Sequence, residues 1–332
     1  MSQIKVLVVD DSIFMRKVIT DILVSDPAIT VVGQASDGLE ALERIQQLHP
    51  DVVTLDIMMP KLSGISTLER IIAGHHPPAV LMVSAYTKED AEVTLNCLAM
   101  GAVDFVLKPS ESAASELDKV AAELLAKVKV AAGVAAGHPA GSIPRHNKRY
   151  AVAVIGASTG GPVALEQLLP MLPKDLPYPV LVAQHLPAQF VHTLTERLAR
   201  QCQLPVRMAT DGDVISPGAI YFAPGGADTE VVQTATGEKI AVVKPSNNIL
   251  TPSVDKLMIS VAKAYGKATV GVILTGMGID GLAGMRAIKH AEGDTIVQDE
   301  QSSVVYGMGR AVAEQGLADA LVPLAQIAER IH

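Results

Sequence analysis

Residues 5–11, KVLVVDD, indicate the fold class, because an apolar and mostly β-branched run, typical of a buried strand, is followed directly by two adjacent carboxylates. Such runs recur through the first 125 residues, each followed by a turn and an amphipathic stretch at helical spacing. We predict strands at residues 5–9, 30–33, 52–56, 79–84 and 104–107. Strands that are apolar on both faces are typical of a parallel sheet covered by helices. Five such units predict a doubly wound α/β domain of flavodoxin-like (βα)5 order, with functional groups at the carboxyl ends of the strands.

The character of the sequence changes after a helix-like stretch over residues 116–130. Residues 131–145 read AAGVAAGHPAGSIPR, in which small residues, Gly and Pro follow no period, as in a linker. From residue 150 the alternation resumes, with strands expected at 151–156, 180–184, 269–274 and 295–298 and a strand-rich interlude over 219–243. We therefore predict two domains, residues 1–125 and 150–332, joined by a linker over residues 126–149. The second domain is expected to be doubly wound α/β with some antiparallel pairing in its middle.

Composition narrows the classes of function. Hydrophobic residues make up 49% of the 332 residues, which excludes intrinsic disorder. A net charge of −8, no basic patch, no Trp and only 3% aromatic residues argue against nucleic acid as a partner. No apolar run reaches the roughly 20 residues of a membrane span, and the first 11 residues lack a signal-peptide layout. Cys97 and Cys202 have no partners at metal-ligand spacing, so we expect two buried, reduced thiols in a cytoplasmic protein.

Five polar residues fall at the predicted strand ends of the first domain. Asp10 and Asp11 follow the first strand, Asp56 closes the third, Ser84 closes the fourth and Lys108 follows the fifth. Any one of these residues alone is typical of a solvent-exposed polar residue that caps a strand end. Together they would crowd one edge of a parallel sheet, where repelling carboxylates favour a hard cation such as Mg²⁺. A carboxylate nucleophile, a divalent metal, a hydroxyl and an ammonium form a set suited to phosphoryl transfer.

At these positions the chain resembles the receiver domain of response regulators. The motifs that carry the resemblance are VVDDS at residues 8–12, LDIMMP at 55–60, VS at 83–84 and LKP at 107–109. The resemblance implies that a histidine kinase phosphorylates Asp56 and that Mg²⁺ is held by Asp10, Asp11 and Asp56. It also implies that Ser84 and Lys108 sense the phosphoryl group, that Phe105 takes the aromatic switch position, and that the Lys108–Pro109 peptide is cis.

A glycine-rich loop, IGASTGG at residues 155–161, marks the second domain between a predicted strand and a helix. Such a loop can cradle phosphate, but this one lacks the P-loop Lys and the spacing of a dinucleotide fingerprint. The other interpretation makes Ser158 a nucleophile on a sharp turn, which then needs a base to take its proton. His185 ends the apolar run 180–184, and Asp280 in the loop GMGIDG could orient it.

The chain order Ser158, His185, Asp280 differs from that of α/β-hydrolases and predicts a different fold. From spacing alone, His185 could equally be a hydrogen-bonding residue at a strand end. Asp280 could likewise be a helix N-cap.

Five further motifs extend the resemblance to nearly the whole chain. They are GASTGG at residues 156–161, QHLP at 184–187, APGG at 223–226, PSVD at 252–255 and TGMG at 275–278. With the receiver, they resemble the chemotaxis protein-glutamate methylesterase (CheB) family. This implies a triad of Ser158, His185 and Asp280, with the Met277 backbone amide stabilising the oxyanion.

The implied substrates are γ-glutamyl methyl esters on cytoplasmic helices of chemoreceptors, hydrolysed to methanol through an acyl-enzyme. Many members also deamidate receptor glutamines. No cofactor is expected in this domain. In the family, the unphosphorylated receiver packs over the active-site cleft and phosphorylation relieves the block, giving sensory adaptation in a two-component chemosensory pathway.

Several positions depart from the family pattern: Ile279 replaces Asn, Ala227 and Asp228 stand near a usual His, Thr251 replaces Arg, and Gly309 replaces Pro. We expect these changes to affect receptor recognition or substrate choice, as in a secondary chemosensory pathway. Two other classes stay open, a DNA-binding response regulator and a nucleotide-binding output domain. A milder alternative keeps the fold with glutaminase activity only, or with methylesterase activity in a nonmotility array.

Overall fold

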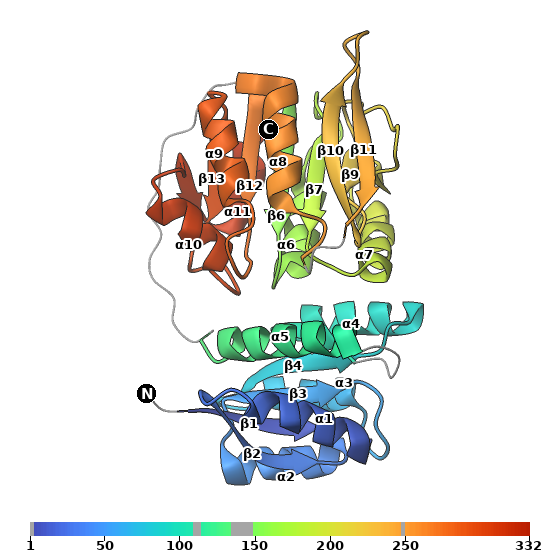
Figure 1. The fold of residues 1–332 in the computed structure, drawn as a ribbon, viewed down its shortest axis with the longest axis vertical. Coiled ribbons are helices and arrows are strands. Elements are labelled where there is room, and N and C mark those ends of the chain that lie inside the picture. The colour runs from blue at the N-terminus through green and yellow to red at the C-terminus, as the bar shows by residue number, and fades with distance from the viewer. Residues whose placement is uncertain (1–2, 109–113, 134–148, 247–249) are drawn as a thin grey trace. The chain divides into compact units, whose positions relative to one another are not determined.

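The computed structural model describes residues 3–108, 114–133, 149–246 and 250–332. The chain divides into two compact units, residues 1–136 and 137–332, each with its own sheet (Figure 1). The predicted cis peptide between Lys108 and Pro109 lies outside the described residues.

The first unit is a five-stranded sheet in the order β2-β1-β3-β4-β5, with every neighbouring pair parallel. Its strands are β1 Ile4–Val9, β2 Ile29–Ala35, β3 Val52–Asp56, β4 Ala79–Ser84 and β5 Asp104–Leu107. Its helices are α1 Ile13–Val24, α2 Gly38–Leu48, α3 Gly64–Ile72, α4 Lys88–Met100 and α5 Ala114–Ala131. The expected flavodoxin-like domain is confirmed, with the second strand longer than predicted at both ends.

The local sequence explains where these helices begin. Ser12, Asp37, Ser63 and Thr87 each accept a hydrogen bond from a first-turn N–H of α1, α2, α3 and α4. Such caps satisfy amides that have no partner inside the helix. Because every cap follows a strand end, each helix leaves the same edge of the sheet on which the polar residues lie.

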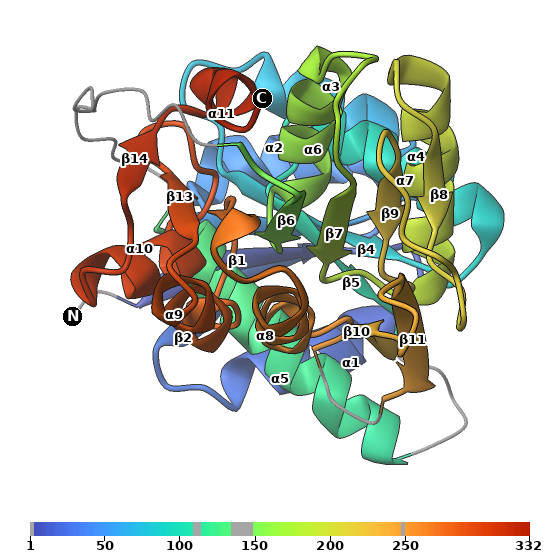
Figure 2. The ribbon, with the colours of Figure 1, turned by 90° about the horizontal axis from the view of Figure 1, so that it is seen from above.

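The second unit contains a seven-stranded sheet in the order β14-β13-β12-β6-β7-β9-β8, again parallel throughout. Its strands are β6 Val152–Ala157, β7 Val180–Gln184, β8 Val206–Met208, β9 Ile220–Phe222, β12 Thr269–Ile273, β13 Asp294–Gln298 and β14 Ala320–Val322. Its helices are α6 Gly161–Leu168, α7 Ala188–Gln201, α8 Val254–Tyr265, α9 Leu282–His290, α10 Gly307–Glu314 and α11 Leu324–Arg330. Helices α6, α7 and α11 cover one face of this sheet and α8 and α9 the other (Figure 2).

A hairpin interrupts the alternation. Strands β10 Ala227–Gln233 and β11 Lys239–Pro245 pair antiparallel and pack against α8. The predicted antiparallel pairing in the middle of the second domain is confirmed.

The order of the strands places the polar loops. The direction of winding changes between β1 and β3 in the first sheet and between β6 and β12 in the second. Ligand and active sites of open α/β sheets lie at such switch points, outside the carboxyl ends of the strands. Asp10, Asp11 and Asp56 lie at the ends of the strands that border the first of these points, and Ser158 and Asp280 follow those that border the second.

Two minor expectations concern cysteines and membranes. Both cysteines are free thiols; Cys97 is buried, whereas Cys202 is only partly buried, which corrects the expectation for that residue. Among the described residues, no helix combines the length and apolar character needed to cross a bilayer.

Candidate functional site

Three neighbouring strands of the second sheet bring Ser158, His185 and Asp280 together. Ser158 follows β6, His185 follows β7, and Asp280 lies in the loop after β12. Strand β6 pairs with β12 on one side and β7 on the other, so the three loops leave one edge of the sheet side by side. Residues far apart in sequence therefore meet because of strand order alone.

Backbone hydrogen bonds fix the turn that carries Ser158. Its N–H donates to the Thr275 carbonyl at 3.1 Å, and its own carbonyl accepts from Gly161 N–H at 2.8 Å. The turn passes through Gly160 at φ 77°, where an added Cβ would lie 2.6 Å from Val304 Cβ. Only glycine meets both the conformation and the close approach. The hydroxyl of Ser158 is thereby held at the start of α6.

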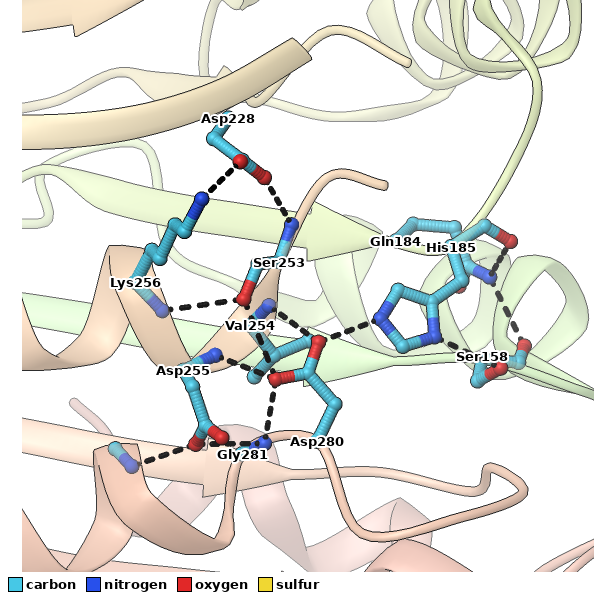
Figure 3. Close-up of polar contacts among 11 residues, drawn as sticks. Ser158, Gln184, His185, Asp228, Ser253, Val254, Asp255, Lys256, Asp280 and Gly281 are labelled. Carbon is cyan, nitrogen blue, oxygen red and sulfur yellow. Dashed lines mark hydrogen bonds and ion pairs between the residues drawn. The ribbon is translucent and has the colours of Figure 1, made fainter. Parts of the chain in front are cut away.

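The His185 ring joins the hydroxyl to the carboxylate (Figure 3). Its Nδ1 lies 3.2 Å from Ser158 Oγ, and its Nε2 lies 2.8 Å from Asp280 Oδ2. The His185 side chain is only 5% exposed. With the proton on Nε2, the ring donates to the carboxylate and leaves Nδ1 free to accept the proton of the hydroxyl.

Asp280 is held by the N-terminus of α8. Its carboxylate accepts from Val254 N–H at 2.8 Å and from Asp255 N–H at 2.9 Å. Burial acts to raise the pKa of Asp280, but the hydrogen bonds from His185 and from these two amides outweigh it and hold the pKa below its usual range. The carboxylate therefore stays ionised beside the imidazole.

This arrangement also bears on the alternative interpretation of Asp280 as a helix N-cap. The residue does cap a helix: it accepts from two first-turn amides of α8, and it also accepts from Gly281 N–H, just before α9, at 3.1 Å. Asp255 caps α9 in return, accepting from Gly281 N–H at 2.9 Å and Gly284 N–H at 2.7 Å. Burial and the nearby charge of Asp280 raise the pKa of Asp255.

The backbone after β12 lies against Ser158. A Cβ at Gly276 would lie 2.9 Å from Ser158 Cβ and 2.3 Å from Met308 Sδ, so this position has room only for glycine. Within the described part of the chain, the Met277 N–H, on the next peptide, has no hydrogen-bond acceptor. An unpaired amide next to a nucleophile is the kind of donor that stabilises an oxyanion.

A second polar cluster lies at the carboxyl edge of the first sheet. Ligand atoms of Asp10, Asp11 and Asp56 lie within 4.8 Å of one another. Lys108 Nζ lies 3.0 Å from Asp10 Oδ2 and 2.9 Å from Asp56 Oδ1. Burial raises the pKa of Asp56 to about 6, against the lowering effect of Lys108. Burial opposes the charge of Lys108, but Asp56 and Asp10 outweigh it and raise the pKa of the ammonium.

These residues fit a divalent cation. The buried Oδ2 of Asp56 has no hydrogen-bond partner among the described residues. The three carboxylates also outnumber the Lys108 ammonium by two. A hard cation with oxygen ligands would satisfy the free oxygen and balance the charge.

The other predicted residues of this cluster are buried but are engaged elsewhere. The Ser84 hydroxyl donates to the Ala85 carbonyl at 3.2 Å and accepts from Thr94 Oγ1 at 2.8 Å. The Phe105 side chain is 2% exposed, and Lys127 Nζ lies 5.2 Å from the centre of its ring. The structure thus brings Asp10, Asp11, Asp56 and Lys108 into contact, whereas the hydrogen bonds of Ser84 go to its own strand end and to α4.

Comparison with known proteins bears on both units. A family model for CheB methylesterase matches residues 153–331. The chain belongs to the CheB methylesterase family. A model for the response regulator receiver domain matches residues 6–120. The predicted ester hydrolase with an N-terminal receiver domain is confirmed, and the two rival output domains, DNA-binding and nucleotide-binding, are excluded.

Relatives cover nearly the whole chain. A protein-glutamate methylesterase/protein-glutamine glutaminase of Symbiobacterium thermophilum is 46% identical over 351 residues, covering 99% of this chain and 96% of the relative. One of the same name from Pyrococcus horikoshii is 42% identical over 347 residues, covering 99% and 93%. The crystal structure of the Thermotoga maritima CheB methylesterase catalytic domain matches with a TM-score of 0.53 and 37% identity, covering 55% of this chain and 98% of that one.

Two of the positions that depart from the CheB pattern lie by the ends of the hairpin. Asp228 accepts from Ser253 N–H at 3.0 Å and from Lys256 Nζ at 2.5 Å. Burial opposes the charge of Asp228, but Lys256 and the Ser253 amide hold its pKa below the usual range. Thr251 Oγ1 accepts from Gly226 N–H at 3.1 Å. Both residues tie the start of the hairpin to the segment that leads into α8.

The other departures are of different kinds. Ile279 is 67% exposed, so its side chain faces solvent next to Asp280 in the loop after β12. Gly309 lies in α10, where an added Cβ would lie 2.6 Å from the Tyr306 ring. Packing accounts for Gly309, whereas nothing in the structure explains why Ile279 is apolar.

Two further residues, Gln184 and Asp255, contact the Ser158, His185 and Asp280 cluster. Both lie within the motifs QHLP and PSVD, but the spacing of these motifs alone predicts no role for either residue. Gln184 donates to the carbonyls of Ser158 and His185, and Asp255 caps α9. Their position inside two motifs was the available signal, but their partners lie on other elements.

Proposed function

We propose that this protein is a phosphorylation-activated serine hydrolase that demethylates glutamate γ-methyl esters on the cytoplasmic helices of chemoreceptors. The same chemistry deamidates receptor glutamines. The observation that carries the proposal is the placement of His185, with Nδ1 3.2 Å from Ser158 Oγ and Nε2 2.8 Å from Asp280. Relatives named for both reactions support it.

In the acylation step, His185 Nδ1 takes the proton of Ser158 as Oγ attacks the ester carbonyl carbon. The Met277 N–H donates to the carbonyl oxygen as it becomes an oxyanion. Asp280 stays ionised and stabilises the imidazolium through Nε2. Its lowered pKa supports this role, because a protonated carboxyl could not balance the new positive charge.

The tetrahedral intermediate then collapses to a glutamyl ester of Ser158. The methoxy group takes the proton from His185 Nδ1 and leaves as methanol; with a glutamine substrate, the amide NH₂ group takes this proton and leaves as ammonia. Water, deprotonated by the same nitrogen, attacks the acyl-enzyme and releases glutamate. The proton returns to Ser158 Oγ, so Ser158, His185 and Asp280 regain their starting protonation states.

In the receiver domain, Asp56 is the proposed phosphoryl acceptor and Asp10, Asp11 and Asp56 would hold Mg²⁺. When bound, the ion supplies Lewis-acid stabilisation of charge on the phosphoryl oxygens. Lys108 pairs with Asp56, and after phosphorylation it would contact the phosphoryl group instead. Ser84 would have to exchange its bond to the Ala85 carbonyl for one to that group.

Phosphorylation would then act on the esterase as an effector. The phosphoryl group carries about −1.5 to −2 charges, in place of the single charge of the Asp56 carboxylate, and must favour the receiver state that permits hydrolysis. A coupling of about 1–3 kcal/mol corresponds to a change in activity of roughly 5- to 150-fold. We assign the receiver to residues 1–125, the linker to 126–149 and the catalytic domain to 150–332, in a cytoplasmic protein whose phosphodonor is a chemotaxis histidine kinase.

Methanol release from methylated chemoreceptor membranes, with and without a small phosphodonor and Mg²⁺, tests this function. We expect activity that rises with the phosphodonor and that Ser158→Ala lowers by up to about a millionfold. Activity retained by Ser158→Ala would contradict the assigned nucleophile. Ammonia release from membranes whose receptors carry glutamine measures deamidation separately.

A further inference from the structure

One buried amide links the backbones of Ser158 and His185. Gln184 is the last residue of β7 and is 1% exposed. Its Nε2 donates to the Ser158 carbonyl at 2.9 Å and to the His185 carbonyl at 3.1 Å (Figure 3). The NH₂ group of Gln184 thus donates both of its protons to the backbones of Ser158 and His185, the two residues that exchange a proton in the proposed reaction.

This link begins where the sheet ends. The last ladder contact between these strand ends is His185 N–H to the Ala157 carbonyl, at 3.0 Å. Beyond it, the two loops diverge, with Ser158 entering α6 and His185 leading to α7. The Gln184 amide adds one more cross-link at that point, so it sets the spacing of Ser158 and His185 after the ladder has stopped.

The other side of the nucleophile turn is already fixed. Thr275 accepts the Ser158 N–H through its carbonyl, and its hydroxyl donates to the Thr159 carbonyl at 2.9 Å. Ser158 is therefore held from both sides: Thr275, in the segment after β12, binds its N–H, and Gln184, at the end of β7, binds its carbonyl.

The same side chain leaves an acceptor unsatisfied. Gln184 Oε1 is buried without a hydrogen-bond partner among the described residues. This oxygen lies only 1.9 Å from the position that a Cβ at residue 161 would take, so a side chain there would clash and α6 must begin with glycine. A buried acceptor without a partner lowers stability, and an apolar side chain of the same length would avoid that loss. The amide is therefore poorly explained by packing alone.

We propose that Gln184 is a positioning residue of the hydrolase, which sets the approach of Ser158 Oγ to His185 Nδ1 through their backbones. The inference rests on the proposed function, because it presupposes that these two atoms exchange the proton. Misplacement of a reacting group by about 1 Å can cost on the order of 100-fold in rate. Substrate binding is not expected to change, since the Gln184 side chain is buried.

The test compares Gln184→Met and Gln184→Glu in the full-length protein. Methionine keeps the length but has no donor, whereas glutamate keeps the shape and places carboxylate oxygens against two carbonyls. Activity is counted per Ser158 site titrated to completion with a fluorophosphonate, so that unfolded molecules do not count. We expect kcat to fall 10- to 100-fold in Gln184→Met and further in Gln184→Glu, with KM within threefold of the wild type.

Thr295→Val is the matched control. Thr295 is fully buried in β13, and its hydroxyl donates to the Leu317 carbonyl and to Asp319. This variant should lower the melting temperature without lowering kcat per titrated site, as expected of a purely structural polar residue. A Gln184→Met protein that behaves like Thr295→Val would overturn the proposal.

The remaining outcomes separate the proposal from the function on which it rests. If kcat of Gln184→Glu stays close to that of the wild type while kcat of Gln184→Met falls, the shape of the side chain alone matters. That result would overturn the positioning role. A rise in KM with unchanged kcat would also overturn it. If Ser158→Ala abolishes activity while both Gln184 variants retain it, only this inference fails. If Ser158→Ala also retains activity, the proposed function fails with it.

Discussion

Asp255 and Asp280 exchange backbone hydrogen bonds across the starts of two helices. Asp280 accepts from the N–H of Asp255 at 2.9 Å, and Asp255 accepts from the N–H of Gly281, the neighbour of Asp280, at 2.9 Å (Figure 3). Each carboxylate thus lies at the N-terminus of the other residue's helix, where the helix dipole favours negative charge. The loop after β12 is thereby joined to the start of α8, which ties the orientation of His185 to the packing of α8 and α9.

Asp280→Asn should lower kcat by about 10⁴-fold, the size of effect seen when the acid of another Ser-His-Asp triad is replaced by its amide. The amide cannot balance the imidazolium, and it can favour the wrong tautomer of His185. Methanol release measures the change, and circular dichroism checks the fold. A kcat within tenfold of the wild type would remove Asp280 from the mechanism.

Asp255→Ala should destabilise the second unit by about 1–2 kcal/mol, because it removes the carboxylate that accepts from Gly281 N–H and Gly284 N–H at the start of α9. In a unit of this size each 1 kcal/mol lowers the melting temperature by about 2–4 °C. Thr87→Ala is the control, since it removes a helix cap of the same kind from α4 in the first unit. Differential scanning calorimetry should show the loss in different transitions. An unchanged transition for the second unit in Asp255→Ala would contradict the capping role.

Asp56→Asn should abolish phosphorylation by a small phosphodonor such as acetyl phosphate. The amide is a far weaker nucleophile than the carboxylate, and it removes one of the three acids that would hold Mg²⁺. Incorporation of labelled phosphate measures the loss. Asp51→Asn is a control, because Asp51 lies at the opposite end of β3 and binds the Lys5 N–H. Label that persists in Asp56→Asn would move the acceptor elsewhere.

A fragment of residues 150–332 should hydrolyse methylated receptors faster than the unphosphorylated whole chain. The proposed coupling predicts a difference of roughly 5- to 150-fold. That unit has its own sheet and core, so the fragment is expected to fold. The rates are compared per site titrated with a fluorophosphonate. Equal rates would show that the receiver does not inhibit.

Much of the fold followed from the sequence, because uniformly apolar strands leave few alternatives. The strands at 52–56, 79–84, 104–107 and 180–184 were predicted with the bounds that the structure gives them. The predicted strand ends also indicated which polar residues would lie close together at one edge of each sheet. The parallel arrangement brings carboxyl ends together, so a residue's place after its strand was enough to nominate it.

The sequence did not determine how those residues interact. That Nδ1 rather than Nε2 of His185 faces Ser158, that Asp280 caps α8 and that Gln184 joins two carbonyls all depend on how β12, β6 and β7 pair and how α8 packs against them. Ser84 shows the same limit, because its partner Thr94 lies on α4. Strand ends are a local property that residue patterns encode, whereas hydrogen-bond partners from other elements are chosen only when non-local packing fixes their distances and directions.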